Sequence, residues 1–181
     1  MKKVALFLAN GFEEIEALVT VDILRRAQIP VLTVSITQEK RVTGAHNIPL
    51  IADAVFRETN FSEVGVLVLP GGMPGAQHLN EHEGLKKLIR EFNQRGERIA
   101  AICAAPMVLG GLGLLREKRA TCYPGFEEKL TGAHVTGEKV VTDRNITTGK
   151  GPGLAFDFAL ALVEQIAGSD KRKETERGLL L

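Results

Sequence analysis

The sequence predicts an α/β protein: a three-layer α/β/α sandwich in which helices cover both faces of a mostly parallel central sheet. Short, continuously apolar runs recur along the 181 residues, as in strands that are buried on both faces. Segments with the apolar spacing of amphipathic helices separate these runs. Strands and helices that alternate in this way build one largely parallel sheet with helices on each side.

The chain begins with a strand and a helix. Residues 4–9 are continuously apolar and stop at Asn10-Gly11, which predicts a buried strand. Residues 13–27 follow with acidic side chains at their start and with Arg25 and Arg26 near their end. This order of charges complements the helix dipole, so we expect a helix here.

Two further strands are expected in the next forty residues. Residues 31–36, which follow Pro30, form the second apolar run, and residues 66–69 form the third. The third run ends at the segment PGGMPG, which is rich in turn-forming residues. Between them, residues 38–53 contain glycine, asparagine and proline and favour a hairpin or short strands.

The middle of the chain continues the alternation. Asn80 is a candidate helix cap, with Glu83 at the capping-box position. The helix that follows has one apolar face and ends at Gly96. Residues 98–102 form the fourth buried strand, and a short, glycine-rich helix comes after it.

The last third of the chain contains weaker strand signals and one strong helix. Residues 119–122 and 139–148 favour short strands, and residues 153–167 favour a helix. We expect a single domain over residues 1–168. Residues 169–181 are expected to form a charged C-terminal tail that is loosely held apart from its final leucines.

Three unusual segments fall at the ends of predicted strands. ANGFEE follows the first strand, PGGMPG the third and CAAP the fourth. Ligands of open parallel sheets bind beyond the carboxyl ends of the strands. The sequence therefore predicts that these segments meet at one sheet edge and form an active site there.

Cys103 is the most informative residue of this group. It lies in AAICAAP, between a predicted strand and a predicted helix, where small neighbours allow a sharp turn. This is the arrangement of a nucleophile elbow. A helix N-terminus close to the sulfur favours the reactive thiolate. The alternative is a small buried side chain, since free cysteines are commonly buried.

A reactive thiolate needs a group that carries protons, and Glu13, Glu14 and Glu16 begin the first helix at the same sheet edge. One of them could reach Cys103, and burial beside a thiol would raise its pKa. The alternative is that all three carboxylates only complement the helix dipole.

Composition excludes several classes of function. A formal net charge of +1, no Trp and one Tyr argue against nucleic acid as a partner. The two cysteines suit neither a disulfide framework nor a metal site. The chain contains no apolar segment long enough to span a bilayer, and its N-terminus lacks a cleavage pattern. We therefore expect a cytoplasmic protein without a membrane partner.

Four motifs, GFEEIEA, LPGGMPGAQ, AAICAAP and GKGPG, follow one another along the chain. Together they resemble the ThiJ/PfpI superfamily, in particular the branch of the parkinsonism-associated deglycase, glyoxalase III and their bacterial relatives. The resemblance extends from residue 2 to about residue 167. It implies a flavodoxin-like fold, a homodimer, and catalysis without a metal or an organic cofactor.

The resemblance also implies roles for individual residues. Cys103 matches the reactive, oxidation-prone cysteine, and Glu16 matches the glutamate that hydrogen-bonds its sulfur. Gly72 and Ala104 match the positions whose N–H groups form the oxyanion hole. Three further positions are expected near the pocket or the dimer contact: Tyr123, His46 and Arg26.

Three positions depart from the family's pattern. The protease-like members carry a histidine directly after the cysteine, where this chain has Ala104, so a peptidase or amidotransferase activity is disfavoured. Tyr123 replaces a histidine of the deglycase branch, and tyrosine is a poor proton shuttle near neutral pH. His46 stands where relatives often have arginine. The other histidines and Cys122, in a predicted strand, match no catalytic role.

Two functions use these residues. In the first, a glyoxalase or deglycase, Cys103 attacks dicarbonyls such as methylglyoxal, free or as adducts, and Glu16 moves protons. In the second, a redox-responsive stress protein or chaperone, Cys103 is oxidised to a sulfinate beside Glu16. The sequence leaves both open, with the enzyme favoured.

Overall fold

The structure is a computed structural model and describes residues 2–181. Its helices are α1 (Glu14–Arg26), α2 (Gly75–Glu81), α3 (Glu83–Gln94), α4 (Pro106–Gly111), α5 (Ala155–Ala167) and α6 (Ser169–Leu179), with short 3-10 turns η1 (Phe56–Glu58), η2 (Glu127–Lys129) and η3 (Pro152–Leu154). Its strands are β1 (Lys3–Leu8), β2 (Val31–Ser35), β3 (Arg41–Thr43), β4 (Pro49–Ile51), β5 (Ala54–Val55), β6 (Val64–Leu69), β7 (Arg98–Ile102), β8 (Arg119–Ala120), β9 (His134–Val135), β10 (Val140–Asp143) and β11 (Ile146–Gly149).

Seven strands form the central sheet, in the order β10-β11-β7-β6-β1-β2-β5. All neighbours pair in parallel except β10 and β11, which are antiparallel. The strands β3 and β4 form the expected hairpin outside this sheet. The order of strands reverses between β1 and β6, which is where flavodoxin-like sheets bind their ligands.

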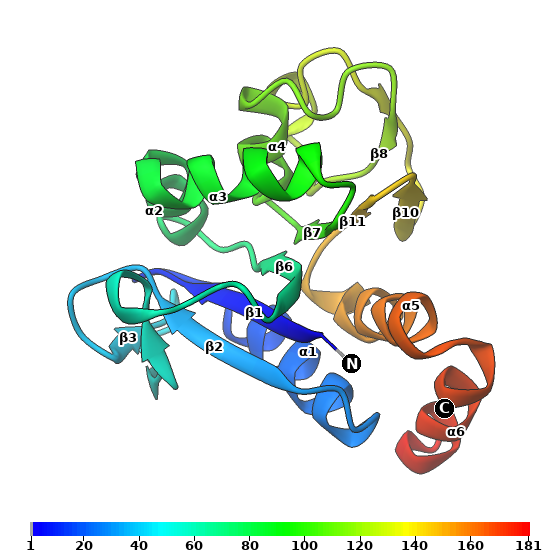
Figure 1. The fold of residues 1–181 in the computed structure, drawn as a ribbon. Coiled ribbons are helices and arrows are strands. Elements are labelled where there is room, and N and C mark those ends of the chain that lie inside the picture. Colours follow the sequence, from blue (N-terminus) through cyan, green and yellow to red (C-terminus); the bar gives the residue numbers. More distant parts are fainter. Residues whose placement is uncertain (1) are drawn as a thin grey trace.

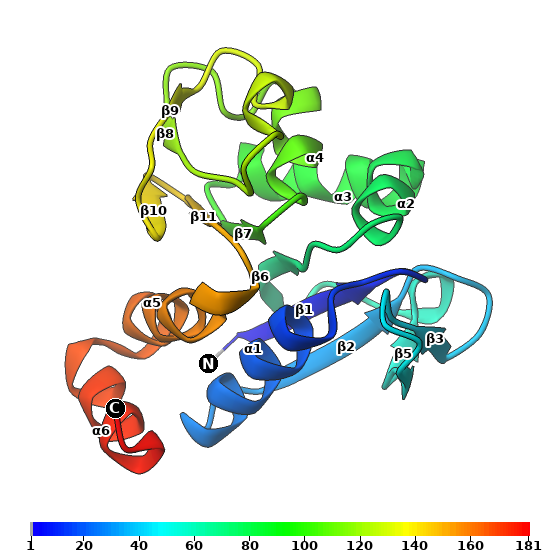
Figure 2. The ribbon, with the colours of Figure 1, turned by 180° about the vertical axis from the view of Figure 1, so that it is seen from behind.

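Helices cover both faces of the sheet (Figures 1 and 2). The helices α1, α5 and α6 lie on one face, while α2, α3 and α4 lie on the other. The core strands are buried along their length, β6 completely. A continuous apolar strand has no face for solvent, so it must be covered on both sides. The three-layer, mostly parallel sandwich that the sequence predicts is confirmed.

The helical segment after β6 differs from the expected one. Asn80 lies inside α2 and caps no helix. The N-cap of α3 is His82, whose Nδ1 accepts a hydrogen bond from the Leu85 N–H at 2.9 Å. A histidine has low statistical preference for this position, but its ring also packs edge-on against Phe56, with centroids 4.6 Å apart. Packing therefore decides the helix boundary here.

Residues 169–179, expected to be loosely held, form the helix α6. It packs against α5, and its buried Thr175 and the ion pair between Arg172 and Glu164 fix it there. The last two leucines, by contrast, are exposed. The prediction of a loosely held segment is wrong because a charged segment can still bury one side of a helix.

Two smaller points concern the sequence predictions. Cys122 lies just after β8 and not within a strand, although it is buried. Between residues 2 and 181, no helix has the length and apolar character that crossing a bilayer requires.

Candidate active site

Three sheet-edge segments come together at the carboxyl ends of β1, β6 and β7, which are adjacent in the sheet. Glu16 lies in the first turn of α1, directly after β1. Gly71 and Gly72 follow β6, and Cys103 follows β7. Parallel strands point their carboxyl ends in the same direction, so the segments after neighbouring strands must meet. The sequence motifs thus share one site.

Cys103 occupies a sharp turn between β7 and α4. Its φ of +64° lies in the left-handed region, which residues other than glycine rarely adopt. Two backbone hydrogen bonds of 2.9 Å fix this turn: the Cys103 N–H donates to Gly149, and the Cys103 carbonyl accepts from the Tyr123 N–H. A strained residue held by its surroundings is typical of a functional site. The strand-to-helix geometry matches a nucleophile elbow.

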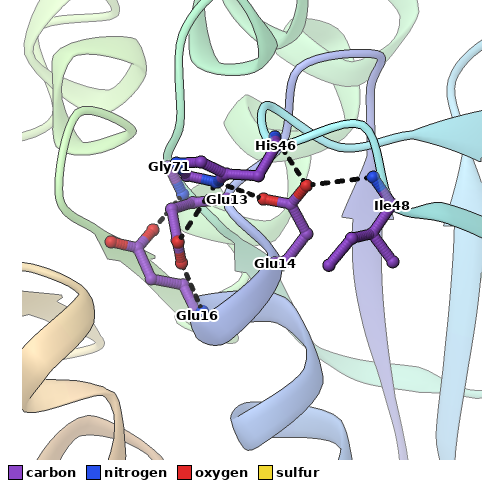
Figure 3. A network of polar contacts seen from close by, with 6 residues as sticks. All are labelled: Glu13, Glu14, Glu16, His46, Ile48 and Gly71. Atoms are coloured by element: carbon purple, nitrogen blue, oxygen red, sulfur yellow. Dashed lines mark hydrogen bonds and ion pairs between the residues drawn. The ribbon is translucent and has the colours of Figure 1, made fainter.

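Glu16 is completely buried beside this turn. Its Oε2 accepts a hydrogen bond from the Gly71 N–H at 2.7 Å. Its Oε1 has no hydrogen-bond partner with ordinary geometry among the described residues. The carboxyl group interacts with the Cys103 thiol, which can share a proton with it. Figure 3 shows how Glu16 reaches Gly71 from the start of α1.

Burial raises the pKa of Glu16 to about 7, and the nearby Glu13 carboxylate adds to this rise. The hydrogen bonds with Cys103 and Gly71 act in the opposite direction. Among residues 2–181, no cationic side chain compensates the Glu16 carboxylate, so desolvation dominates. A group with such a pKa can both donate and accept a proton near neutral pH.

Burial also raises the pKa of the Cys103 thiol, as do the charge and the hydrogen bond of Glu16. The N–H groups of Gly72 and Ala104 face the sulfur and lower the pKa, but less strongly. The sequence-based expectation of a lowered thiol pKa is therefore wrong, because burial outweighs the nearby N–H groups and the Glu16 charge adds to the rise. Protonation of Glu16 removes the repulsive charge, so the two groups titrate as a coupled pair.

Gly72 brings its N–H to the sulfur through a conformation that needs glycine. Its φ is +86°, and an added Cβ would lie 2.4 Å from the Glu13 backbone nitrogen. A side chain would therefore disrupt the contact between the segments after β6 and β1. Together with Ala104, the residue after the cysteine, Gly72 provides a pair of donors on one side of Cys103.

The three remaining predicted residues lie in different places. Tyr123 borders the turn, since its N–H binds the Cys103 carbonyl and its ring is close to Gly151. Arg26 lies in the last turn of α1, at the other end of the helix from Glu16, where it pairs with Asp22 at 2.6 Å. The structure therefore does not bring Arg26 to the Cys103 site.

His46 lies next to the start of α1 and belongs to a network that the sequence did not suggest. Its Nδ1 lies 2.8 Å from Glu14 Oε2, and its backbone N–H donates to Glu14 Oε1 at 2.7 Å (Figure 3). Glu14 is buried, whereas His46 is exposed. The hydrogen bond to Glu14 raises the pKa of His46. Thirty-two residues separate the two, so no local sequence pattern could have paired them.

Comparisons with known proteins identify the family of this chain. Residues 2–165 match the model of the DJ-1/PfpI family. The chain is 35% identical to Drosophila melanogaster protein dj-1beta, over 99% of this chain and 97% of that protein. It is also 35% identical to Caenorhabditis elegans glutathione-independent glyoxalase DJR-1.2, over 93% of this chain and 90% of that protein.

Solved structures and plant relatives extend the comparison. The crystal structure of a mutant DJ-1 superfamily protein from Salmonella typhimurium has a TM-score of 0.95 and 36% identity, covering 99% of this chain and 98% of that one. Arabidopsis thaliana protein DJ-1 homolog B is 37% identical over 99% of this chain. The chain spans 42% of that protein and 47% of the related homolog A, so it corresponds to less than half of each. The family model matches almost the whole chain, and relatives of similar length and solved structures of the same fold agree with it, so this chain belongs to the DJ-1/PfpI family.

Proposed function

We propose that this protein is an enzyme that converts reactive dicarbonyls, such as methylglyoxal or its early adducts on amines and thiols, through covalent attack by Cys103. The observation that carries the proposal is the buried Glu16, with a pKa of about 7, next to the Cys103 thiol. The name of the C. elegans relative, a glutathione-independent glyoxalase, supports the same chemistry.

In the proposed first step, Glu16 accepts the thiol proton and the sulfur attacks the aldehyde carbon of methylglyoxal. A C–S bond forms, and the π electrons of the carbonyl move to its oxygen. The N–H groups of Gly72 and Ala104 stabilise the resulting oxyanion. Glu16 then returns the proton to this oxygen, which gives a hemithioacetal.

In the second step, Glu16 moves a proton between the two substrate carbons. It removes the proton from the carbon bonded to sulfur, which gives an enediolate, and delivers that proton to the neighbouring carbon. The hydroxyl proton on the first carbon moves to the oxygen of the second, so that a C=O bond forms next to sulfur. The product is a thioester of a 2-hydroxy acid, and no external oxidant is needed because one carbon is oxidised as the other is reduced. Water hydrolyses the thioester to lactate and regenerates the thiol. A carboxyl with a pKa near neutral suits both directions of proton transfer.

The decisive experiment measures lactate formed from methylglyoxal in the absence of glutathione. We expect the wild-type protein to produce lactate and the Cys103→Ser and Glu16→Gln variants to lose at least about 100-fold in kcat/KM. Cys122→Ser is the matched control, because Cys122 is equally buried but lacks a neighbouring Glu16. Full activity of Cys103→Ser would exclude the covalent mechanism.

A redox-responsive role uses the same residues and is the second candidate. Peroxide would supply the two oxygen atoms that convert the Cys103 thiolate into a sulfinate. The N–H groups of Gly72 and Ala104 favour negative charge at this sulfur. Two results together would favour this role. Cys103→Ser would keep its dicarbonyl activity, and in the wild type dilute peroxide would add two oxygen atoms to Cys103 but none to Cys122.

We further propose that the protein acts as a homodimer, through the outer face of α1 and the adjacent β4. Ile15, Leu18, Ile48 and Ile51 are between 41% and 68% exposed there. Leu18 and Ile51 also line an apolar cavity of about 160 Å³ between these elements. Exposed apolar side chains that border such a cavity are typical of protein contacts. The cytoplasmic location expected from the sequence stays a prediction.

A further inference from the structure

Two buried carboxylates and one exposed histidine form a second polar cluster beside the Cys103 site: Glu13, Glu14 and His46. One ligand atom from each residue lies within 4.8 Å of the other two. The His46 Nδ1 is 2.8 Å from Glu14 Oε2 and 4.0 Å from Glu13 Oε1. Figure 3 shows the two carboxylates at the start of α1 with the His46 ring beside them.

Glu13 has one oxygen that the protein leaves unused. Its Oε2 caps α1 by accepting the Glu16 N–H at 2.8 Å. Its Oε1 accepts no hydrogen bond from any residue between 2 and 181, although only 10% of the side chain is exposed. The side chain keeps this small exposure, so water or an ion can reach the free oxygen. This oxygen faces His46.

The cluster also carries more negative than positive charge. Glu13 and Glu14 are both buried, and among residues 2–181 His46 is the one side chain within ion-pair distance of either. Even a protonated His46 would neutralise only one of two carboxylates. A divalent cation would compensate both charges at once.

We propose that Glu13, Glu14 and His46 bind a divalent transition-metal ion of the Zn²⁺ type. Carboxylate oxygens and imidazole nitrogens both bind such ions, and zinc sites with three protein ligands take water at the fourth position. Ligand atoms of a tetrahedral zinc site lie about 3.3 Å apart, for bonds of roughly 2.0 Å. The observed separations of 2.8 and 4.0 Å from His46 Nδ1 bracket this value, and the two carboxylate oxygens lie within 4.8 Å of each other. Modest movements of these three side chains would complete the site.

The binding mode assigns one atom of each residue to the ion. Glu13 Oε1, Glu14 Oε2 and His46 Nδ1 bind it, and the ion replaces the proton that Glu14 and His46 share. The hydrogen bonds to the other carboxylate oxygens stay intact and orient both side chains. Glu14 Oε1 still accepts the His46 backbone N–H, and Glu13 Oε2 still accepts the Glu16 N–H at the start of α1. The inference does not depend on the dicarbonyl proposal, since the site contains neither Cys103 nor Glu16.

The test is calorimetric titration of the full chain with Zn²⁺ alone, after removal of metals by a chelator. We expect one ion per chain in the wild type and unchanged binding in Cys103→Ala. We expect binding at least about tenfold weaker in His46→Arg and in Glu13→Gln. Arginine keeps a positive charge next to Glu14 but cannot bind a metal, and glutamine can still accept the capping hydrogen bond.

A second histidine provides the matched control. His134 is also exposed and lies 3.6 Å from a single carboxylate, that of Glu117, so His134→Ala should bind Zn²⁺ like the wild type. Absorption spectra with Co²⁺ locate the ion, because thiolate ligation produces strong near-ultraviolet charge-transfer bands that nitrogen and oxygen ligands do not. Such bands, loss of binding in Cys103→Ala, or wild-type affinity in His46→Arg would each overturn the proposal. His46 is exposed, so its variant remains informative if Glu13→Gln fails to fold.

Discussion

The Glu16 carboxyl and the Cys103 side chain lie so close to Gly71 that one added methyl group there would collide with both. A Cβ built on Gly71 would lie 2.8 Å from Glu16 Oε2 and 2.7 Å from Cys103 Cβ. Gly71 also donates its N–H to Glu16. The absence of a side chain at this position therefore allows the acid and the thiol to approach each other.

Replacing Gly71 with alanine should damage the site. We expect Gly71→Ala to lower the free energy of unfolding by about 1–3 kcal/mol, as is typical of overpacking, and to abolish dicarbonyl turnover. Denaturant unfolding and the lactate assay measure the two effects. Gly153→Ala is the control, because a Cβ there would contact nothing within 4 Å. Normal turnover by Gly71→Ala would show that the close approach of Glu16 and Cys103 is not required.

Alkylation of Cys103 should depend on pH in two steps. Ionisation of Glu16, near pH 7, disfavours the neighbouring thiolate, so the two groups give two apparent pKa values. Glu16→Gln should leave one step and should react faster than the wild type above pH 7, because the repulsive charge is gone. Mass spectrometry after brief iodoacetamide treatment gives the rates. Cys122 is the internal control, and its alkylation rate should be the same in both proteins. If the pH profiles of Cys103 alkylation coincide in the wild type and in Glu16→Gln, the two groups are not coupled.

Tyr123 is expected to limit proton transfer. If the histidine of related proteins assists this step, Tyr123→His should raise kcat for methylglyoxal more than it changes KM. The Tyr123 backbone is held by Cys103, so the replacement should leave the turn in place. Tyr123→Phe, which removes only the hydroxyl, separates proton transfer from packing. An unchanged or lower kcat in Tyr123→His, with its fold intact by circular dichroism, would mean that Glu16 alone moves the proton.

His82 should make stability depend on pH. Burial lowers the pKa of His82 in the folded protein, and the neutral ring caps α3. The unfolded chain therefore takes up the proton first as the pH falls, so stability decreases below about pH 6.5. A backbone hydrogen bond and the negative charge of Glu83 oppose this shift of the pKa but do not reverse it.

His82→Asn should cap α3 without titrating. Between pH 8 and pH 5, we expect the free energy of unfolding to decrease less in this variant than in the wild type. The two decreases should differ by a value on the order of 1 kcal/mol, the usual energy of an N-cap. Denaturant unfolding at both pH values measures this. His46 is present in both proteins, so its opposite contribution cancels. If the free energy of unfolding decreases equally in both proteins, His82 does not cause the pH dependence.

Self-association should depend on the apolar face of α1 and β4. Ile51→Lys places a charge at a side chain that is 68% exposed, so the fold should tolerate it while the proposed dimer should not. Analytical ultracentrifugation should detect dimers of the wild type and monomers of the variant. Val135→Lys, at an exposed apolar position on the distant β9, serves as control. Dimers that persist in Ile51→Lys would place the interface elsewhere.

The order of strands and helices was readable from the sequence because each element carries its own periodic signal. The apolar runs of β1, β6 and β7 predict buried strands wherever they lie in the chain, and parallel strands bring their carboxyl ends to one edge. The association of the Glu16, Gly72 and Cys103 segments follows from this rule. The family's motifs then indicated which residues of each segment to examine.

Tertiary structure decided what depends on contacts between distant residues. The pairing of Glu14 with His46 joins positions whose local sequences carry no common pattern. The cap of α3 by His82 depends on packing against Phe56, and the ordering of α6 depends on the surface of α5. The pKa of Cys103 is the clearest case. Local sequence places a helix N-terminus near the sulfur, but burial and the Glu16 charge, which only the folded chain brings together, outweigh it.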